Sequence, residues 1–286
     1  MPYEFGGKTL RNKEFISCVL LVLLGLALSS AKCVSSLADN AGYRAVCVGL
    51  AKDPDLFAHF KRSGVYTLLH EYTTCAEGHL YASYTLEHYP DLLRFVEMFR
   101  KNDLLGDPIT HTYPFFGQMS PSTVRYIKLA GDIAHHLGSL DGKRVVEIGA
   151  GYGGLCTVLS SLHKWKNYTI VDTEENLAIA RLYLNQLGIK DVTFAPFDKI
   201  PKDAEIFLSD HGFGQCHRTL QERCLRSMVK AGSSGYMICS SYPRHFRIRP
   251  LSQQELVKKI SREKLHCELV VEEPEVSKDN FILTWK

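Results

Sequence analysis

The stretch VVEIGAGYGG, residues 145–154, decides how the rest of the chain is interpreted. Its first residues are apolar or β-prone, and glycines follow at positions 149, 151, 153 and 154. A strand that runs into glycines brings the backbone close to a ligand at places where a Cβ would clash. A helix-like run follows from Leu155 to His163, and the free N–H groups and positive dipole of its first turn would face the same ligand. The stretch therefore predicts a nucleotide-type cofactor at the carboxyl end of a first β-strand.

The composition of the chain allows one large domain with an extension. It has 286 residues, 45% of them hydrophobic, and a net charge of only +3 without a basic run, so we expect no nucleic-acid partner. Nine cysteines at irregular spacing, with no C-x-x-C pair, favour free, buried thiols in a reducing compartment over a disulfide framework. The histidines and cysteines do not have zinc-ligand spacing, so we expect no metal site.

One segment near the amino terminus does not have the mixed polar and apolar composition of a soluble domain. Residues 15–31 carry no charge, consist mostly of Leu, Val, Ile and Ala, and are flanked by lysines and an arginine. As a helix they would reach about 26 Å, just short of a bilayer core of roughly 30 Å. We expect this segment to engage a membrane as a short anchor with the catalytic domain in the cytoplasm. The alternatives are a cleaved signal peptide, which would make the protein secreted or lumenal, and a buried helix, which no polar face supports.

The sequence divides into three parts. Residues 1–32 contain the apolar anchor or signal segment, and residues 33–118 form a helical extension on the acceptor side, with helix starts at Pro54 and Pro90. The stretch 106–119 is rich in Pro, Gly and aromatic residues and predicts a boundary or lid loop. Residues 119–286 form the cofactor domain, which opens with a helix capped by Ser120 and stopped at Gly138.

Strands and helices alternate from residue 143 onward, which predicts an α/β, Rossmann-like fold. The last two strands are joined by only nine residues, which suits an antiparallel pair because a parallel crossover needs a dozen or more. We therefore expect a mostly parallel seven-stranded sheet with one antiparallel strand, plus the N-terminal helical extension. The predicted strands are residues 144–148, 168–171, 192–197, 205–209, 236–240, 267–271 and 281–285.

The glycine pattern alone leaves the cofactor open. Gly149-x-Gly151-x-x-Gly154 satisfies the dinucleotide fingerprint, and Asp172 stands where an acid would hold ribose hydroxyls, so an NAD(P)-dependent oxidoreductase is one candidate. Two features favour S-adenosylmethionine instead. Glu147 completes the E-x-G-x-G-x-G form common in methyltransferases, and the chain ends in a β-hairpin rather than a second βαβαβ half. A plain tight turn is the third alternative, but it would not require so many glycines.

Five segments, in order, make the chain resemble the bacterial sugar O-methyltransferase family. The resemblance covers about residues 110–286 and implies a class I fold, S-adenosylmethionine as cofactor and a sugar or glycan hydroxyl as acceptor. Two departures are the segment 210–215, where the family has a polar Ser/Asn-rich stretch, and the short link between Phe197 and Glu205. The segments are SPSTVRYIKLAGDI (120–133), VVEIGAGYGGLCTVL (145–159), YTIVDTEENLAIARLYL (168–184), LSDHGFGQCHRTLQERCL (208–225) and EPEVSKDNFILTW (273–285).

The resemblance and the residue chemistry together give a candidate cofactor cradle. Gly149, Gly151 and Gly153 would pass close to the methionine and ribose parts of the cofactor. Glu147 would act through a water on the amino group or fix the shape of the loop. Asp172 would accept hydrogen bonds from the ribose hydroxyls; alternatively it is only a charge near a helix N-terminus.

Further candidates flank the cradle. Phe197 or Asp198 would border the adenine, unless this is simply the end of a strand. Arg125 and Tyr126 match an R-Y pair of the resembled family, and the cation could hold the cofactor's carboxylate; alternatively Arg125 lies on a solvated helix face.

A hydroxyl acceptor must lose its proton as it attacks, so a general base is needed near the methyl group. His211 and Asp210, in the loop after the fourth predicted strand, are the catalytic candidates. His245, Arg247 and Arg249 would bind an anionic acceptor or form a solvated basic loop. A catalytically silent S-adenosylmethionine-binding membrane protein is a further alternative.

Overall fold

The computed structural model describes residues 4–5, 8–9, 41–229, 233–240, 248–263 and 266–286. Its centre is a seven-stranded sheet with the strand order β10-β11-β9-β8-β5-β6-β7. All neighbouring strands are parallel except that β11 runs antiparallel to both β9 and β10. This is the class I methyltransferase arrangement, and it confirms the predicted fold. The strands are β5 (Arg144–Ile148), β6 (Asn167–Val171), β7 (Val192–Ala195), β8 (Ile206–Asp210), β9 (Ser234–Ser240), β10 (Cys267–Val271) and β11 (Asn280–Trp285).

Helices cover both faces of the sheet, which is why its central strands are almost continuously apolar. Val145 packs in a core with helices α7 (Pro121–Leu137), α8 (Gly154–Leu159) and α9 (Glu174–Gln186). Val146, on the other face, packs with α10 (Arg218–Met228) and α11 (Gln253–Ser261). Because side chains alternate along a strand, Glu147 points to the same face as Val145. Its carboxylate therefore lies on the α7, α8 and α9 side of the sheet.

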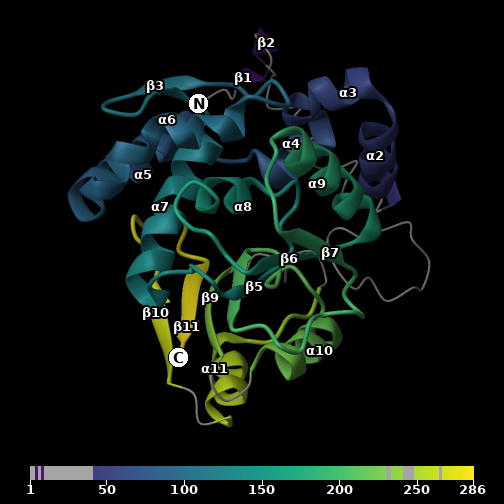
Figure 1. The fold of residues 1–286 in the computed structure, drawn as a ribbon, viewed down its shortest axis with the longest axis vertical. Coiled ribbons are helices and arrows are strands. Elements are labelled where there is room, and N and C mark those ends of the chain that lie inside the picture. Colours follow the sequence, from purple (N-terminus) through teal and green to yellow (C-terminus); the bar gives the residue numbers. More distant parts are fainter. Residues whose placement is uncertain (1–3, 6–7, 10–40, 230–232, 241–247, 264–265) are drawn as a thin grey trace.

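The helical extension packs against that same face. Figure 1 shows its helices gathered at one end of the molecule, opposite α10 and α11. Helix α2 contacts α9, α5 contacts α7, and the apolar side chains of the extension belong to one core with the sheet. The elements are α2 (Ala41–Lys52), α3 (Pro54–Ala58), η2 (Phe60–Arg62), α4 (Gly64–His70), α5 (Cys75–His88), η3 (Pro90–Phe95), α6 (Val96–Phe99), η4 (Arg100–Asp103), β3 (His111–Tyr113) and β4 (Gly117–Met119). A separate pair, β1 (Glu4–Phe5) and β2 (Lys8–Thr9), precedes them.

The structure corrects two local predictions. The stretch 106–119, expected to be a boundary or lid loop, contains the antiparallel hairpin β3–β4. Strand β7 ends at Ala195 rather than at residue 197, because Pro196 lacks the N–H that a further ladder bond would need. No helix lies between Ala195 and Ile206, as the short link implied.

Helix α7 is buried nearly all round, since the extension covers the side opposite the sheet. Its buried charges are consequently paired. Lys128 Nζ lies 2.7 Å from an Asp132 carboxylate oxygen, and Asp132 also accepts hydrogen bonds from the hydroxyls of Tyr89 and Tyr236. The polar network ties the extension, α7 and β9 together.

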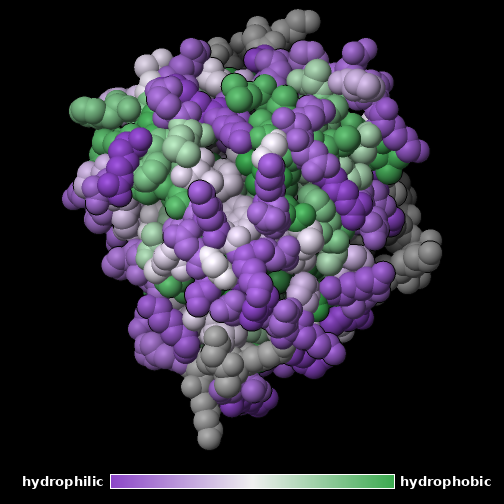
Figure 2. All heavy atoms as spheres, viewed as in Figure 1, coloured by the Kyte–Doolittle hydropathy of each residue, from purple (hydrophilic) through white to green (hydrophobic). Residues whose placement is uncertain are grey.

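The membrane prediction falls on residues 15–31, which lie outside the described part of the chain. Within the described residues no helix has the length and hydropathy to cross a bilayer. On the face shown in Figure 2, hydrophobic side chains gather mainly where the extension lies, and the end with α10 and α11 is largely hydrophilic. The described residues contain seven cysteines, five of which are buried.

Candidate functional site

A cavity lies at the carboxyl ends of β5 and β8, beneath the extension. It brings together six of the predicted residues, which come from α7, β5 and the two strand-end loops, with three residues of the extension. The lining consists of Leu69, His70, Tyr72, Arg125, Tyr126, Glu147, Gly149, Ala150, Leu155, Asp210, His211, Gly212 and Gln215.

Gly149, the first glycine of the loop, lines this site, whereas Gly151 faces His70 and Gly153 faces Leu184. Gly149, Gly151 and Gly153 have φ angles of +73°, +57° and +91°, in the left-handed region that favours glycine. A Cβ on Gly149 would lie 2.5 Å from the Cα of Gly212, so the loops after β5 and β8 touch backbone to backbone. Glycine is therefore required at Gly149 by both conformation and contact.

Asp172, directly after β6, holds the loop in shape. Its Oδ2 accepts a hydrogen bond from the Gly151 N–H at 3.1 Å, and its Oδ1 accepts from Thr173 N–H and Asn176 Nδ2 at 2.7 and 3.0 Å. Burial raises the pKa of Asp172 to about 6, against the effect of these three donors. Since a carboxylate oxygen can accept two hydrogen bonds, Oδ2 has capacity for a ligand hydroxyl.

Glu147 is almost completely buried in β5, with 1% of its surface exposed. The Tyr168 hydroxyl donates to its Oε2 at 2.7 Å. Burial, reinforced by the nearby carboxylates of Asp210 and Asp172, raises the pKa of Glu147 to about 8. The side chain is thus mostly protonated at neutral pH, and a cationic group placed in the cavity would favour its ionised form.

A pH-dependent stability difference follows for Glu147→Gln. Glutamate in an unfolded chain titrates near pH 4.3, so between that pH and about 8 the folded protein keeps a proton that the unfolded chain has lost. Stability therefore falls as the pH rises through this window. The glutamine variant keeps a partner for Tyr168 without the titration. We expect its melting temperature to exceed that of the wild type by several degrees at pH 8.5 and by much less at pH 5.5.

Thermal melts followed by circular dichroism check this expectation. Glu263→Gln, at an exposed position after α11, is the matched control, and its melting temperature should equal that of the wild type at both pH 5.5 and pH 8.5. If the difference in melting temperature between Glu147→Gln and the wild type is the same at both pH values, the inference that burial raises the pKa of Glu147 is contradicted.

Arg125 and Asp210 form a buried, two-pronged ion pair across the cavity. Nη1 of Arg125 donates to Oδ2 of Asp210 at 2.6 Å, and Nη2 donates to Oδ1. Burial alone would raise the pKa of Asp210, but the guanidinium outweighs it and holds that pKa below its ordinary value. In this structure the carboxylate held by Arg125 is that of Asp210, and an ionised, paired Asp210 is a poor general base.

His211 follows Asp210 with a φ of +60°, an uncommon conformation for a residue with a side chain. Its Nε2 lies 4.0 Å from Asp210 Oδ1, and its ring meets that of Tyr72 edge-on at 6.2 Å. Burial lowers the pKa of His211, although Asp210 acts in the opposite direction. A neutral imidazole at the cavity wall is thereby available to accept a proton.

Five predicted residues do not line this cavity: Gly151, Gly153, Asp172, Phe197 and Asp198. Asp198 is exposed in the turn after β7, and Phe197 packs against the core that holds α10 and α11. Their proposed place beside an adenine stays a prediction. Of the basic loop, residues 245 and 247 lie outside the described residues, and Arg249 is exposed.

The structure adds residues that the sequence did not single out. His70 and Tyr72, at and just after the end of α4, form the cavity wall opposite the glycine loop. His70 and Tyr72 belong to no sequence motif, because the glycine loop that they approach lies far along the chain. The one local indication of a role is that a mostly apolar helix ends in a polar residue.

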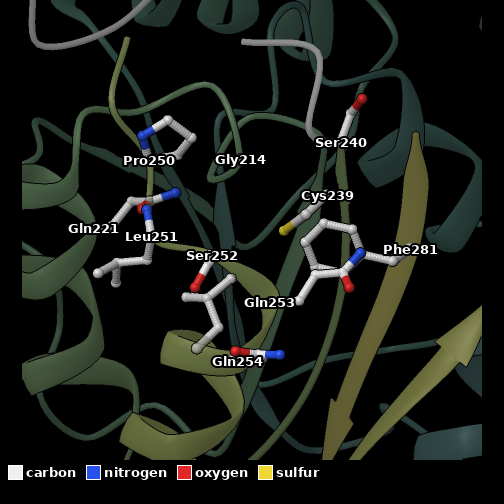
Figure 3. A pocket seen from close by; sticks show the side chains of 11 residues that line it. Gly214, Gln221, Cys239, Ser240, Pro250, Leu251, Ser252, Gln253, Gln254 and Phe281 are labelled. Carbon is white, nitrogen blue, oxygen red and sulfur yellow. The ribbon is translucent and has the colours of Figure 1, made fainter. Parts of the chain in front are cut away.

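A second cavity, of about 310 Å³, lies on the other side of the loop 211–215. Figure 3 shows Gln221 and Leu251 on one side of it and Cys239 and Phe281 on the other. Among the described residues its lining contains no charged side chain. The lining residues are Gly214, Gln221, Cys239, Ser240, Pro250, Leu251, Ser252, Gln253, Gln254, Leu256 and Phe281.

In the parts of the chain that the structure covers, no three histidine, cysteine, aspartate or glutamate side chains gather as a metal site would need.

Comparison with known proteins gives likenesses of fold. No protein family model and no curated protein sequence matches the chain. Similar solved structures include geranyl diphosphate C-methyltransferase from Streptomyces coelicolor, which is 12% identical with a TM-score of 0.46 over 55% of this chain and 78% of that one. An S-adenosylmethionine-dependent methyltransferase from Clostridium acetobutylicum is 11% identical, with a TM-score of 0.45 over 55% and 88%. One from Aquifex aeolicus is 18% identical, with a TM-score of 0.42 over the same shares. Likenesses at this level carry no information about the reaction.

Proposed function

We propose that this protein is an S-adenosylmethionine-dependent methyltransferase. The observation that carries the proposal is the sheet order, in which the reversed strand β11 lies between β9 and β10. A dinucleotide-binding doubly wound sheet would continue with a parallel sixth strand at that place. The glycine loop follows β5, whose neighbours β6 and β8 lie on opposite sides, so it stands at the switch point where such sheets bind their ligands.

The residues at this point suit the cofactor chemically. S-adenosylmethionine, when bound, supplies an activated methyl group for in-line displacement at carbon. Gly149 lines the cavity without a side chain, and Oδ2 of Asp172 has capacity for a ribose hydroxyl. The buried carboxyl of Glu147 lies where a positive charge on the ligand would draw it into its ionised form.

For the acceptor we propose a hydroxyl group, with His211 as general base. The imidazole is neutral and lies in the cavity wall, and the ionised Asp210 at 4.0 Å would stabilise it once it is protonated. That the hydroxyl belongs to a sugar or glycan rests on the sequence resemblance.

Methyl transfer from methyl-labelled S-adenosylmethionine to a glycan extract, with mass analysis of the products, tests this function. We expect labelled methyl ethers with the wild type and a rate lower by about 10²- to 10⁴-fold with His211→Ala. Glu263→Gln is the active control. Cofactor binding without transfer to any product would contradict catalysis, and transfer that is unchanged in His211→Ala would exclude that base.

A further inference from the structure

The side chain of His70 lies directly on the glycine loop. A Cβ built on Gly151 would lie 2.5 Å from His70 Nδ1 and 2.6 Å from its Cε1. This is the surface of the loop that the proposed cofactor would contact. The free volume of the cavity is only about 40 Å³, whereas small-molecule sites usually provide roughly 300–1,000 Å³. The extension therefore fills the space above the loop.

A chain of hydrogen bonds holds His70 in this place. The Tyr43 hydroxyl donates to Asn176 Oδ1 at 2.6 Å and lies 2.6 Å from His70 Nε2. Asn176 in turn donates to Asp172. Because the Tyr43 proton points to Asn176, Nε2 of His70 must be the donor, so Nδ1 faces the loop without a proton. Burial lowers the pKa of His70 to about 4, which keeps the ring neutral.

The segment that carries His70 is short and is held mainly by apolar packing. Helix α4 spans only Gly64–His70, and residues 72–74 after it have no regular secondary structure. The ring centroids of Tyr66 and His70 are 4.4 Å apart, and in the Arg44–Glu175 ion pair between α2 and α9 the two side chains are 52% and 15% exposed. Tyr43 and Tyr66 are at most 2% exposed, so binding of a ligand must offset the loss of their burial as well as of these hydrogen bonds.

We propose that α2 and α4 form a lid over the cofactor site, with Tyr43–Asn176 as its latch and His70 as the group that the cofactor displaces. The inference rests on the proposed function and names the regulation of that site. A lid that is closed most of the time reduces the apparent affinity by the fraction of open molecules. Weakening the latch therefore strengthens cofactor binding.

Calorimetric titration with S-adenosylhomocysteine tests the lid. We expect Tyr43→Phe, which keeps the ring and loses the latch hydroxyl, to bind about fivefold more tightly than the wild type. His70→Ala should bind at least as tightly as Tyr43→Phe. His79→Ala, in α5 against Tyr113 and outside the cavity, is the control and should match the wild type. Hydrogen exchange supplies a second readout: S-adenosylhomocysteine should speed exchange of amides 64–72 and slow it at 149–154.

The outcomes distinguish a failure of the lid proposal from a failure of the proposed function. If the wild type binds and both variants bind equally or more weakly, His70 and Tyr43 are ordinary contacts and the lid is wrong. Slower exchange of residues 64–72 on binding would overturn it too. If neither the wild type nor either variant binds, the proposed function fails and the lid fails with it. Binding by the variants alone supports both.

Discussion

Replacing Arg125 with alanine should lower the free energy of unfolding by about 3–5 kcal/mol. Arg125 is only 3% exposed, and its guanidinium makes a two-pronged pair with Asp210. Without it, the carboxylate of Asp210, whose side chain is 11% exposed, remains without its cationic partner. Urea denaturation followed by circular dichroism measures the loss.

An exposed ion pair provides the matched control. Arg44 pairs with Glu175 with 52% of its side chain accessible, so Arg44→Ala should cost no more than about 1 kcal/mol. The double variant Arg125→Ala, Asp210→Ala should recover part of the loss, because no unpaired charge is left behind. Equal losses from Arg125→Ala and Arg44→Ala would show that the buried pair has no special role.

The second large effect is expected at Gly149. An alanine there would adopt a φ of +73° and place its Cβ 2.5 Å from the Cα of Gly212, which is backbone and cannot rotate away. We expect the loops after β5 and β8 to separate, with a loss of stability of several kcal/mol and at least a roughly 100-fold weaker affinity for S-adenosylhomocysteine. Denaturation and calorimetry measure the two losses.

Gly188→Ala is the control that distinguishes backbone strain from steric contact. It has a φ of +67°, but a Cβ there would meet nothing within 4 Å. Gly188→Ala should therefore lose only about 1 kcal/mol from the unfavourable backbone conformation and leave the affinity unchanged. A Gly149→Ala variant that behaves like Gly188→Ala would contradict the close approach of the two loops.

The fold was predictable because its signals are local. Alternating strands and helices, glycines at strand ends and the short link before the last strand predict a mostly parallel sheet with one antiparallel strand, which the structure has. The cap at Ser120 also lies where the sequence places it. The buried charges of α7 were not predictable, since Asp132 takes its hydroxyl partners from Tyr89 and Tyr236, far away along the chain.

The candidate site likewise has a part that the sequence predicts and a part that it does not. The glycine loop and Asp172 come together as expected, because the ends of adjacent parallel strands meet at one edge of the sheet. The partner of Arg125 was not foreseen: Asp210 lies 85 residues further on. Nor were Tyr43 and His70, whose positions depend on how the extension docks rather than on spacing.

The most direct test of the central claim is a calorimetric titration of the protein with S-adenosylhomocysteine and, separately, with NADH. We expect S-adenosylhomocysteine to bind with micromolar affinity, Asp172→Asn to weaken that binding at least tenfold, and NADH to give no signal. Tight binding of NADH with no response to S-adenosylhomocysteine would contradict the assignment and favour an oxidoreductase.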